Sequence, residues 1–124
     1  MQSLLDLFMS RPQADEMSLF DNMHMSRALE AAREAGARGE VPVGAVIVHG
    51  PSNEVIVAAS NKVLELKDPT AHAEMLAIRE ACKIRQSERL VDCDLYVTLE
   101  PCPMCAQAIS FARIRRLYFA ASDE

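Results

Sequence analysis

One histidine and two cysteines in this sequence have the types and spacing of metal ligands. His72 and Glu74 lie two residues apart, and Cys102 and Cys105 lie three residues apart further along the chain. Cysteines at i and i+3 share one face of a helix, and the partial positive charge at a helix N-terminus favours thiolate over thiol. Because magnesium and calcium prefer oxygen ligands, an imidazole and two thiolates suit zinc better. The set predicts a zinc site with Glu74 as a neighbouring carboxylate.

The number of protein ligands decides what a zinc site can do. Structural sites are closed by four protein ligands, whereas catalytic sites leave one position for water. Cys82 and Cys93 lie roughly 15 Å and 20 Å from the predicted ligands along a helix and a strand, so we interpret them as ordinary buried thiols. His24 and His49 are explained more simply by a helix face and a turn. The sequence therefore favours three ligands and one open position.

Chain breakers and hydrophobic periodicity predict the elements that position these residues. A breaker at 68–70 precedes a helix that starts near His72 and continues to Ile84. Pro101 follows a β-rich run at 95–99. Because proline is tolerated where a helix begins, we expect a helix over about 102–113. The other predicted elements are a helix over 19–37, strands over 43–48 and 55–59 joined as a hairpin, and a strand over 117–120.

The order of these elements predicts an α/β layered domain. A helix crossover joins the last two strands, so we expect those strands to be parallel. The 124 residues, at 13.7 kDa, are the size of one domain. We assign residues 18–124 to that domain and residues 1–17 to an N-terminal extension or tail.

Composition and charge exclude several classes of function. A formal charge of −5 is not the strongly basic balance of a general nucleic-acid binder, so any contact with nucleic acid must be local. Arg113, Arg115 and Arg116 form the one dense basic cluster, which could be a solvated helix end or a phosphate contact. Glycine-rich phosphate-binding motifs are absent, which disfavours dinucleotide and ATP chemistry. Neither a signal peptide nor a membrane-spanning stretch is evident, which favours a cytoplasmic protein.

Longer stretches of the chain resemble one family. Residues 40–46, Asn61, residues 68–74 and residues 96–102 look like the bacterial tRNA-specific adenosine deaminases of the cytidine and deoxycytidylate deaminase superfamily. This resemblance implies a three-layer α/β/α cytidine-deaminase-like fold with a central mixed sheet. It also implies one zinc ion per subunit, a tRNA anticodon stem-loop as partner and a homodimer. The family continues beyond the end of this chain, so the C-terminal part of the fold is expected to be missing.

The resemblance also implies roles for individual residues. The zinc-ligand positions correspond to His72, Cys102 and Cys105, and the proton-shuttle position corresponds to Glu74. Asn61 corresponds to a position that contacts the target nucleoside, and Ala73 to one whose backbone amide faces the base. Asp123 corresponds to a position that contacts a flanking nucleotide. The implied reaction converts the wobble adenosine to inosine by attack of water on C6. The carboxylate takes a proton from the water, delivers it to N1 of the ring, and later helps to protonate the departing ammonia.

Two other functions fit the same residues. A deaminase of a free base, nucleoside or nucleotide, of the guanine or cytosine type, would agree with the net acidity of the chain. A non-catalytic zinc-stabilised binding module would need a fourth protein ligand and would make Glu74 dispensable. Base recognition also needs apolar walls, for which Phe111 and Val43 are candidates.

Overall fold

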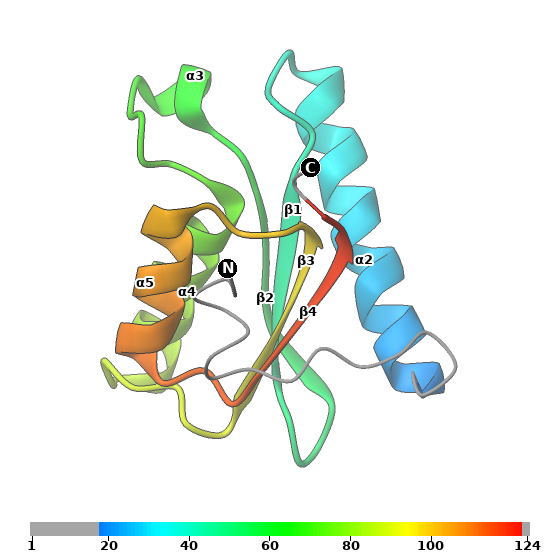
Figure 1. Cartoon of the computed structure of the whole chain (residues 1–124), viewed down its shortest axis with the longest axis vertical. Coiled ribbons are helices and arrows are strands. Elements are labelled where there is room, and N and C mark those ends of the chain that lie inside the picture. The colour runs from blue at the N-terminus through cyan, green and yellow to red at the C-terminus, as the bar shows by residue number, and fades with distance from the viewer. Residues whose placement is uncertain (1–17, 123–124) are drawn as a thin grey trace.

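A mixed sheet of four strands lies between two layers of helices (Figure 1). The fold is that of a computed structural model, which describes residues 18–122. The predicted extension at 1–17 and the predicted contact at Asp123 lie outside these described residues. The elements in chain order are α2 (Leu19–Ala37), β1 (Gly44–His49), β2 (Glu54–Ser60), α3 (Val63–Leu66), α4 (Ala73–Arg85), β3 (Cys93–Leu99), α5 (Pro103–Ala112) and β4 (Arg116–Ala121).

The strand order in the sheet is β2-β1-β3-β4. β1 pairs antiparallel with β2 through the predicted hairpin, and it also pairs antiparallel with β3. β3 and β4 are parallel, with α5 as the crossover between them, as expected from the order of elements. The predicted mixed sheet is therefore confirmed.

The two faces of the sheet are covered by different helices. Side chains alternate along β1, so that Val46 and Val48 pack on the α2 side while Ala45 and Ile47 pack into the larger core beneath α4 and α5. All four residues are fully buried. This alternation produces the α/β/α layering that the sequence predicts.

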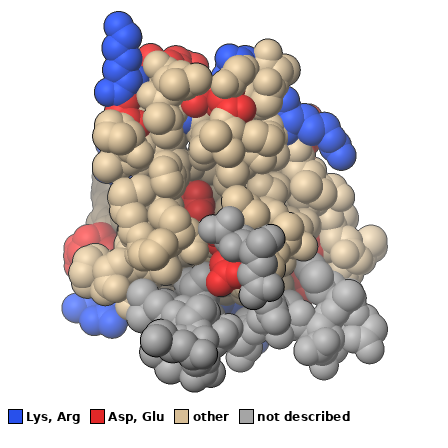
Figure 2. Space-filling view, turned by 45° about the horizontal axis from the view of Figure 1, so that its top comes forward, with Lys and Arg blue, Asp and Glu red and all other residues tan. Residues whose placement is uncertain are grey.

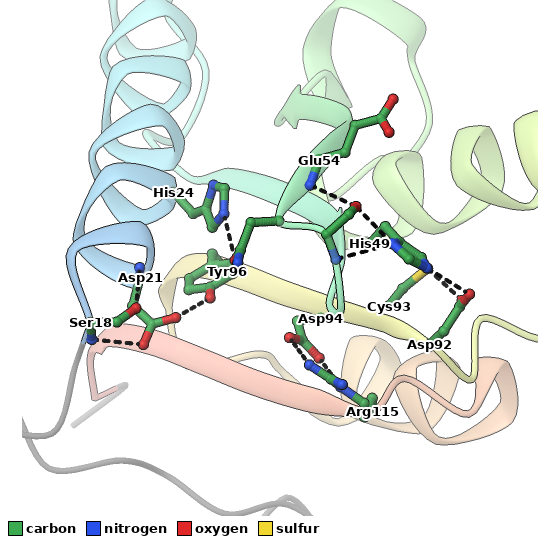
Figure 3. Close-up of polar contacts among 12 residues, drawn as sticks. Ser18, Asp21, His24, His49, Glu54, Asp92, Cys93, Asp94, Tyr96 and Arg115 are labelled. Carbon is green, nitrogen blue, oxygen red and sulfur yellow. Dashed lines mark hydrogen bonds and ion pairs between the residues drawn. The ribbon is translucent and has the colours of Figure 1, made fainter.

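Polar contacts fix the start of α2 against the sheet (Figure 3). Ser18 and Asp21 form a capping box, in which each side chain accepts a hydrogen bond from the other's backbone nitrogen. The Tyr96 hydroxyl, from β3, donates a hydrogen bond to the Asp21 carboxylate. The helix that covers this face is therefore anchored through its first turn.

Gly44 sets how closely β1 approaches α2. A Cβ atom at this position would overlap the carbonyl oxygen of Ala28 and lie 2.7 Å from the backbone nitrogen of Ala32. These are backbone atoms of a helix, so they cannot move aside without displacing the helix. We expect Gly44→Ala to lower the free energy of unfolding by about 3 kcal/mol, at the upper end of overpacking costs, as measured by chemical denaturation.

Gly36, inside α2, offers a matched control for this substitution. A Cβ atom there would lie 3.4 Å from the Pro42 Cβ atom, which is an ordinary contact. Because alanine has a higher helix propensity than glycine, Gly36→Ala should be neutral or stabilise the protein by up to about 1 kcal/mol. Equal stabilities of the two variants would show that β1 and α2 are not in such close contact.

The four-residue helix α3 is not expected from the sequence. Its N-cap residue, Lys62, makes no side-chain capping bond, and one turn of helix is too short to show hydrophobic periodicity. Its position, close to the start of α4, matters for the site described below. Among the described residues, no helix is long and apolar enough to cross a membrane.

Candidate active site

His72 stands at the start of α4 with its side chain available to the site. The turn before it is fixed by Asp68, whose Oδ1 accepts hydrogen bonds from the Thr70 backbone nitrogen at 2.8 Å and the Thr70 hydroxyl at 2.7 Å. His72 is the N-cap residue of α4 and has an extended backbone conformation. Its imidazole makes no capping bond to the helix, so the ring is free to act as a ligand.

Cys102 and Cys105 occupy the corresponding place on α5. Cys102 is the N-cap residue, with an extended backbone and no side-chain capping bond, and Pro103 begins the helix. Cys105 lies three residues later and is fully buried. The N-termini of α4 and α5 therefore meet at one point, which brings the three ligand side chains together. Without metal, burial and the nearby charge of Glu74 raise the pKa of the Cys105 thiol, so a bound cation is needed to favour the thiolate.

The three ligand atoms lie at the separations that a zinc ion requires. His72 Nδ1 is 3.6 Å from Cys102 Sγ and 3.5 Å from Cys105 Sγ, and the three atoms all lie within 4.8 Å of one another. Tetrahedral zinc with Zn–S distances of about 2.3 Å and a Zn–N distance of about 2.0–2.1 Å separates nitrogen from sulfur by about 3.5–3.6 Å. The donor set therefore fits zinc. Within residues 18–122, no further His, Cys, Asp or Glu joins this group.

The other cysteines and histidines have different surroundings. Cys93 is buried at the start of β3, where burial and the neighbouring Asp92 raise the pKa of its thiol to about 12. His49 is 3.2 Å from the carboxylate of Asp92, and the His24 ring packs against Tyr96 in a tilted arrangement, with 5.1 Å between the ring centroids (Figure 3). Cys82 lies near the end of α4, where burial raises the pKa of its thiol. The structure thus supplies no fourth ligand from these residues.

Glu74 lies in the first turn of α4 beside the ligand group. Its side chain is buried, with only 4% of the residue exposed. Burial raises the pKa of the carboxyl above its usual 4.5, and this effect outweighs the opposing influence of its own backbone N–H, of His72 and of the Cys105 thiol. A carboxyl group with a raised pKa is suited to accept and return a proton near neutral pH.

A cavity of about 420 Å³ opens in front of the ligand group. Its polar lining includes His72, Glu74, Cys102, Asn61, Glu40 and Glu100, and its apolar lining includes Val41, Val43, Val63, Leu64 and Leu99. Figure 2 shows the molecule with the top of Figure 1 turned forward. Lys and Arg side chains lie mainly at the periphery of that face. The cavity therefore offers apolar walls, as a planar base requires, rather than a basic interior.

One of the two predicted wall residues lines this cavity and the other does not. Val43 lies in the lining, as the sequence suggests. Phe111 is 71% exposed on α5 and is absent from the lining, so that prediction is wrong. Val63 and Leu64 are wall residues that sequence reasoning missed, because they belong to the unexpected helix α3.

Asn61 and Ala73 are joined to one another at the edge of the cavity. The Ala73 backbone nitrogen donates a hydrogen bond to Asn61 Oδ1 at 2.8 Å, and both residues are buried. With its oxygen directed at the Ala73 N–H, the Asn61 side chain still offers its NH₂ group as a donor. The pair thus fixes the start of α4, and its donor at the cavity is the Asn61 NH₂ group, because the Ala73 N–H is already bound.

The predicted basic cluster lies at the far end of α5 from Cys102. Arg113 is the C-cap residue of α5. Arg115 forms a two-pronged pair with Asp94 at 2.9 Å and 2.8 Å, and these hydrogen bonds raise the pKa of its guanidinium (Figure 3). Arg115 therefore holds strand β3, and the structure favours neither a solvated end nor a phosphate contact for this residue.

Known proteins resemble both the sequence and the fold. Residues 19–121 match the cytidine and deoxycytidylate deaminase zinc-binding region. The chain is 59% identical over 99 residues to the tRNA-specific adenosine deaminase of Agrobacterium fabrum, a match that covers 80% of this chain and 64% of that relative. The chain thus spans slightly less than two thirds of that relative's length.

Solved structures agree with this relationship. A structure from work on A-to-I editing by tRNA:A34 deaminases has a TM-score of 0.79 at 57% identity, covering 82% of this chain and 72% of that one. Guanine deaminase from Bacillus subtilis has a TM-score of 0.78 at 42% identity, covering 86% of this chain and 66% of that one. From the match over residues 19–121, together with these similarities, the chain belongs to the cytidine and deoxycytidylate deaminase family.

Proposed function

We propose that the protein is a zinc-dependent tRNA adenosine deaminase, which converts the wobble adenosine of an anticodon stem-loop to inosine. The observation that carries the proposal is the meeting of His72, Cys102 and Cys105 with a buried Glu74 at one apolar-walled cavity. The choice of substrate is supported by the tRNA-specific adenosine deaminase of Agrobacterium fabrum, at 59% identity.

Each residue of the site has a defined task in this reaction. Zinc held by His72, Cys102 and Cys105 would supply water acidified towards neutral pH as the nucleophile. Glu74 takes the proton that the water loses and delivers it to N1 of the adenine ring. The same carboxylate then takes the second proton of that water, from the new hydroxyl on C6, and passes it to the amino group, which leaves as ammonia when the C6–N bond breaks. The NH₂ group of Asn61 orients the nucleoside, and the apolar walls exclude competing water.

The proposal extends to the domain, the location and the assembly of the protein. Residues 18–124 form the deaminase domain, with Asp123 near a flanking nucleotide and the Ala73 amide near the base. A tRNA substrate is consistent with a cytoplasmic enzyme, and the resemblance to tRNA-specific deaminases supports a homodimer with one zinc ion in each subunit.

A deamination assay on defined substrates tests the proposal. Zinc-loaded protein is incubated separately with an adenosine-containing anticodon hairpin and with free adenosine, guanine and cytidine, and inosine, xanthine, uridine and ammonia are measured. We expect conversion of the hairpin and little reaction of the free compounds. Reaction of the free compounds alone would refute the tRNA assignment.

A free-base deaminase is the second candidate function. The observation that favours it is the TM-score of 0.78 with guanine deaminase from Bacillus subtilis. The two candidates share the metal site and the proton shuttle, so the substrate comparison above separates them. A purely structural zinc module is disfavoured, because the ligand group among residues 18–122 contains three members rather than four.

The role of Asn61 gives a specific prediction. Asn61→Asp keeps an oxygen to accept the Ala73 N–H, but it replaces the NH₂ donor with a second acceptor. We expect KM to rise about tenfold or more, because a donor to the substrate is lost and a negative charge faces it. Steady-state kinetics with zinc content measured in parallel provides the check. An unchanged KM would remove Asn61 from the substrate site.

A further inference from the structure

Glu40 directs both oxygens of its carboxylate at helix α3. The residue is only 6% exposed, although it lies in the loop between α2 and β1. Its Oε1 accepts a hydrogen bond from the Leu64 backbone nitrogen at 3.1 Å, and its Oε2 accepts one from the Glu65 backbone nitrogen at 2.9 Å. These N–H groups belong to the first turn of α3, where the helix itself offers no acceptor. Glu40 therefore caps α3 from a distant part of the chain.

Arg38, two residues earlier, holds the other end of the same segment. Its Nη2 donates hydrogen bonds to the Ser60 hydroxyl at 3.0 Å and to the Asn61 carbonyl oxygen at 3.2 Å. Its Nε lies 3.9 Å from the Glu65 carboxylate. Arg38 and Glu40 thus grip residues 60–65 at both ends, and we call these two residues the loop clamp.

The Glu40 carboxylate is stabilised in its charged form. Burial by itself raises the pKa of this carboxyl, but hydrogen bonds from the Glu65 and Leu64 backbone and the charge of Arg38 outweigh burial. The net result is a pKa below the usual 4.5. Both hydrogen bonds to α3 are therefore charge-assisted at neutral pH, and such bonds are stronger than neutral ones.

The segment held by the loop clamp carries three residues of the cavity lining, Asn61, Val63 and Leu64. Within α3, no side chain caps the helix in place of Glu40. Four residues are also too few to form a stable helix alone. We propose that Glu40 is a positioning residue for substrate recognition: by capping α3 it fixes one apolar wall of the cavity and the backbone that carries Asn61. The inference rests on the proposed function only in taking this cavity as the substrate site.

The substitution Glu40→Gln tests this role with little change in volume. A glutamine side chain has one carbonyl oxygen, so it can accept only one of the two backbone hydrogen bonds, and its NH₂ group opposes the other. We expect KM to rise about tenfold, which corresponds to one charge-assisted hydrogen bond, while kcat changes by less than about twofold. Zinc content should equal that of the wild type, because His72, Cys102 and Cys105 are untouched.

Amide hydrogen exchange provides a readout that does not depend on activity. We expect at least one of the backbone amides of Leu64 and Glu65 to exchange at least about tenfold faster in Glu40→Gln, because glutamine can accept only one of their two hydrogen bonds. Glu80→Gln is the matched control, since it makes the same chemical change at an exposed position on α4 and leaves both backbone bonds to Glu40 and the contacts of Arg38 intact. Asp94→Asn controls for general destabilisation, because it weakens the Arg115 pair far from the cavity. Neither control should change KM.

The outcomes separate this inference from the proposed function. An unchanged KM or unchanged amide exchange in Glu40→Gln would overturn the inference, as would an equal rise in KM in Asp94→Asn. If Glu40→Gln does not fold, Glu40→Asp, which keeps the charge but shortens the side chain by one methylene, should show a smaller shift in the same direction. If the wild type converts none of the tested substrates, the proposed function fails. Amide exchange then decides the inference, because it does not depend on the substrate, and equal exchange rates of Leu64 and Glu65 in wild type and Glu40→Gln would refute it.

Discussion

Glu74→Gln is expected to lose at least about 100-fold in turnover while the protein keeps its zinc and its fold. Glutamine has nearly the same volume as glutamate, so the buried first turn of α4 can retain its packing. It cannot accept a proton from water or return one to ammonia, and general acid–base catalysis typically contributes 10²–10⁴-fold. The loss should appear in kcat, measured on the substrate that the wild type converts.

Glu80→Gln is the matched control for that experiment. Glu80 lies on the same helix, α4, but is exposed to solvent, so its replacement should leave turnover and zinc content unchanged. Zinc content measured by mass spectrometry distinguishes a lost proton shuttle from a damaged metal site. Near-normal turnover of a zinc-loaded Glu74→Gln protein would show that the carboxylate has no catalytic task.

Although Glu74→Gln is expected to lose turnover, it should not destabilise the metal-free protein. Because burial raises the pKa of Glu74 in the folded state, the charged carboxylate favours the unfolded state, where its pKa is near 4.5. The glutamate contributes most to stability below pH 4.5 and loses this contribution as the pH rises through the raised folded value. At pH 7, metal-free Glu74→Gln should therefore be at least as stable as the metal-free wild type in thermal denaturation. A helix-dipole role alone would make it less stable.

The ligand group could be predicted from the sequence because its signals are local. Asp68 and Pro101 mark the starts of two helices, and the chemistry of imidazole and thiol restricts what His72 and Cys102 can do there. The alternation of buried residues in β1 and the hairpin after it likewise depend on neighbouring residues. These features can be recognised from a single sequence because a few adjacent positions determine them.

The features that could not be predicted depend on partners distant in the chain. Helix α3 is capped by Glu40, which precedes it by a whole hairpin, so nothing in its own residues indicates a helix. From the sequence, Arg115 fits either a solvated helix end or a phosphate contact, because its partner, Asp94, is distant in the chain and lies on strand β3. Phe111 resembled a wall residue because periodicity does not show which side of α5 faces the cavity. In each case tertiary contacts decided the outcome.

Cys105→Ser is expected to abolish zinc binding. A serine hydroxyl is not ionised at neutral pH, so the substitution leaves two ligands where zinc requires at least three. Burial raises the pKa of the Cys105 thiol, and the nearby charges of Glu74 and Cys102 raise it further, so the metal-free protein holds a neutral thiol here. Zinc must displace that proton, and zinc affinity in the wild type should therefore weaken as the pH falls.

Cys93→Ser separates loss of a ligand from loss of a buried thiol. Cys93 and Cys105 are both fully buried cysteines, but Cys93 lies outside the ligand group. After gel filtration, mass spectrometry should find about one zinc per chain in Cys93→Ser and almost none in Cys105→Ser. A chelator should lower the melting temperature of Cys93→Ser, because bound zinc stabilises only the folded state, and should leave that of Cys105→Ser unchanged. Full zinc occupancy in Cys105→Ser would mean that the metal is held by other residues, and the site proposed here would then have to be abandoned.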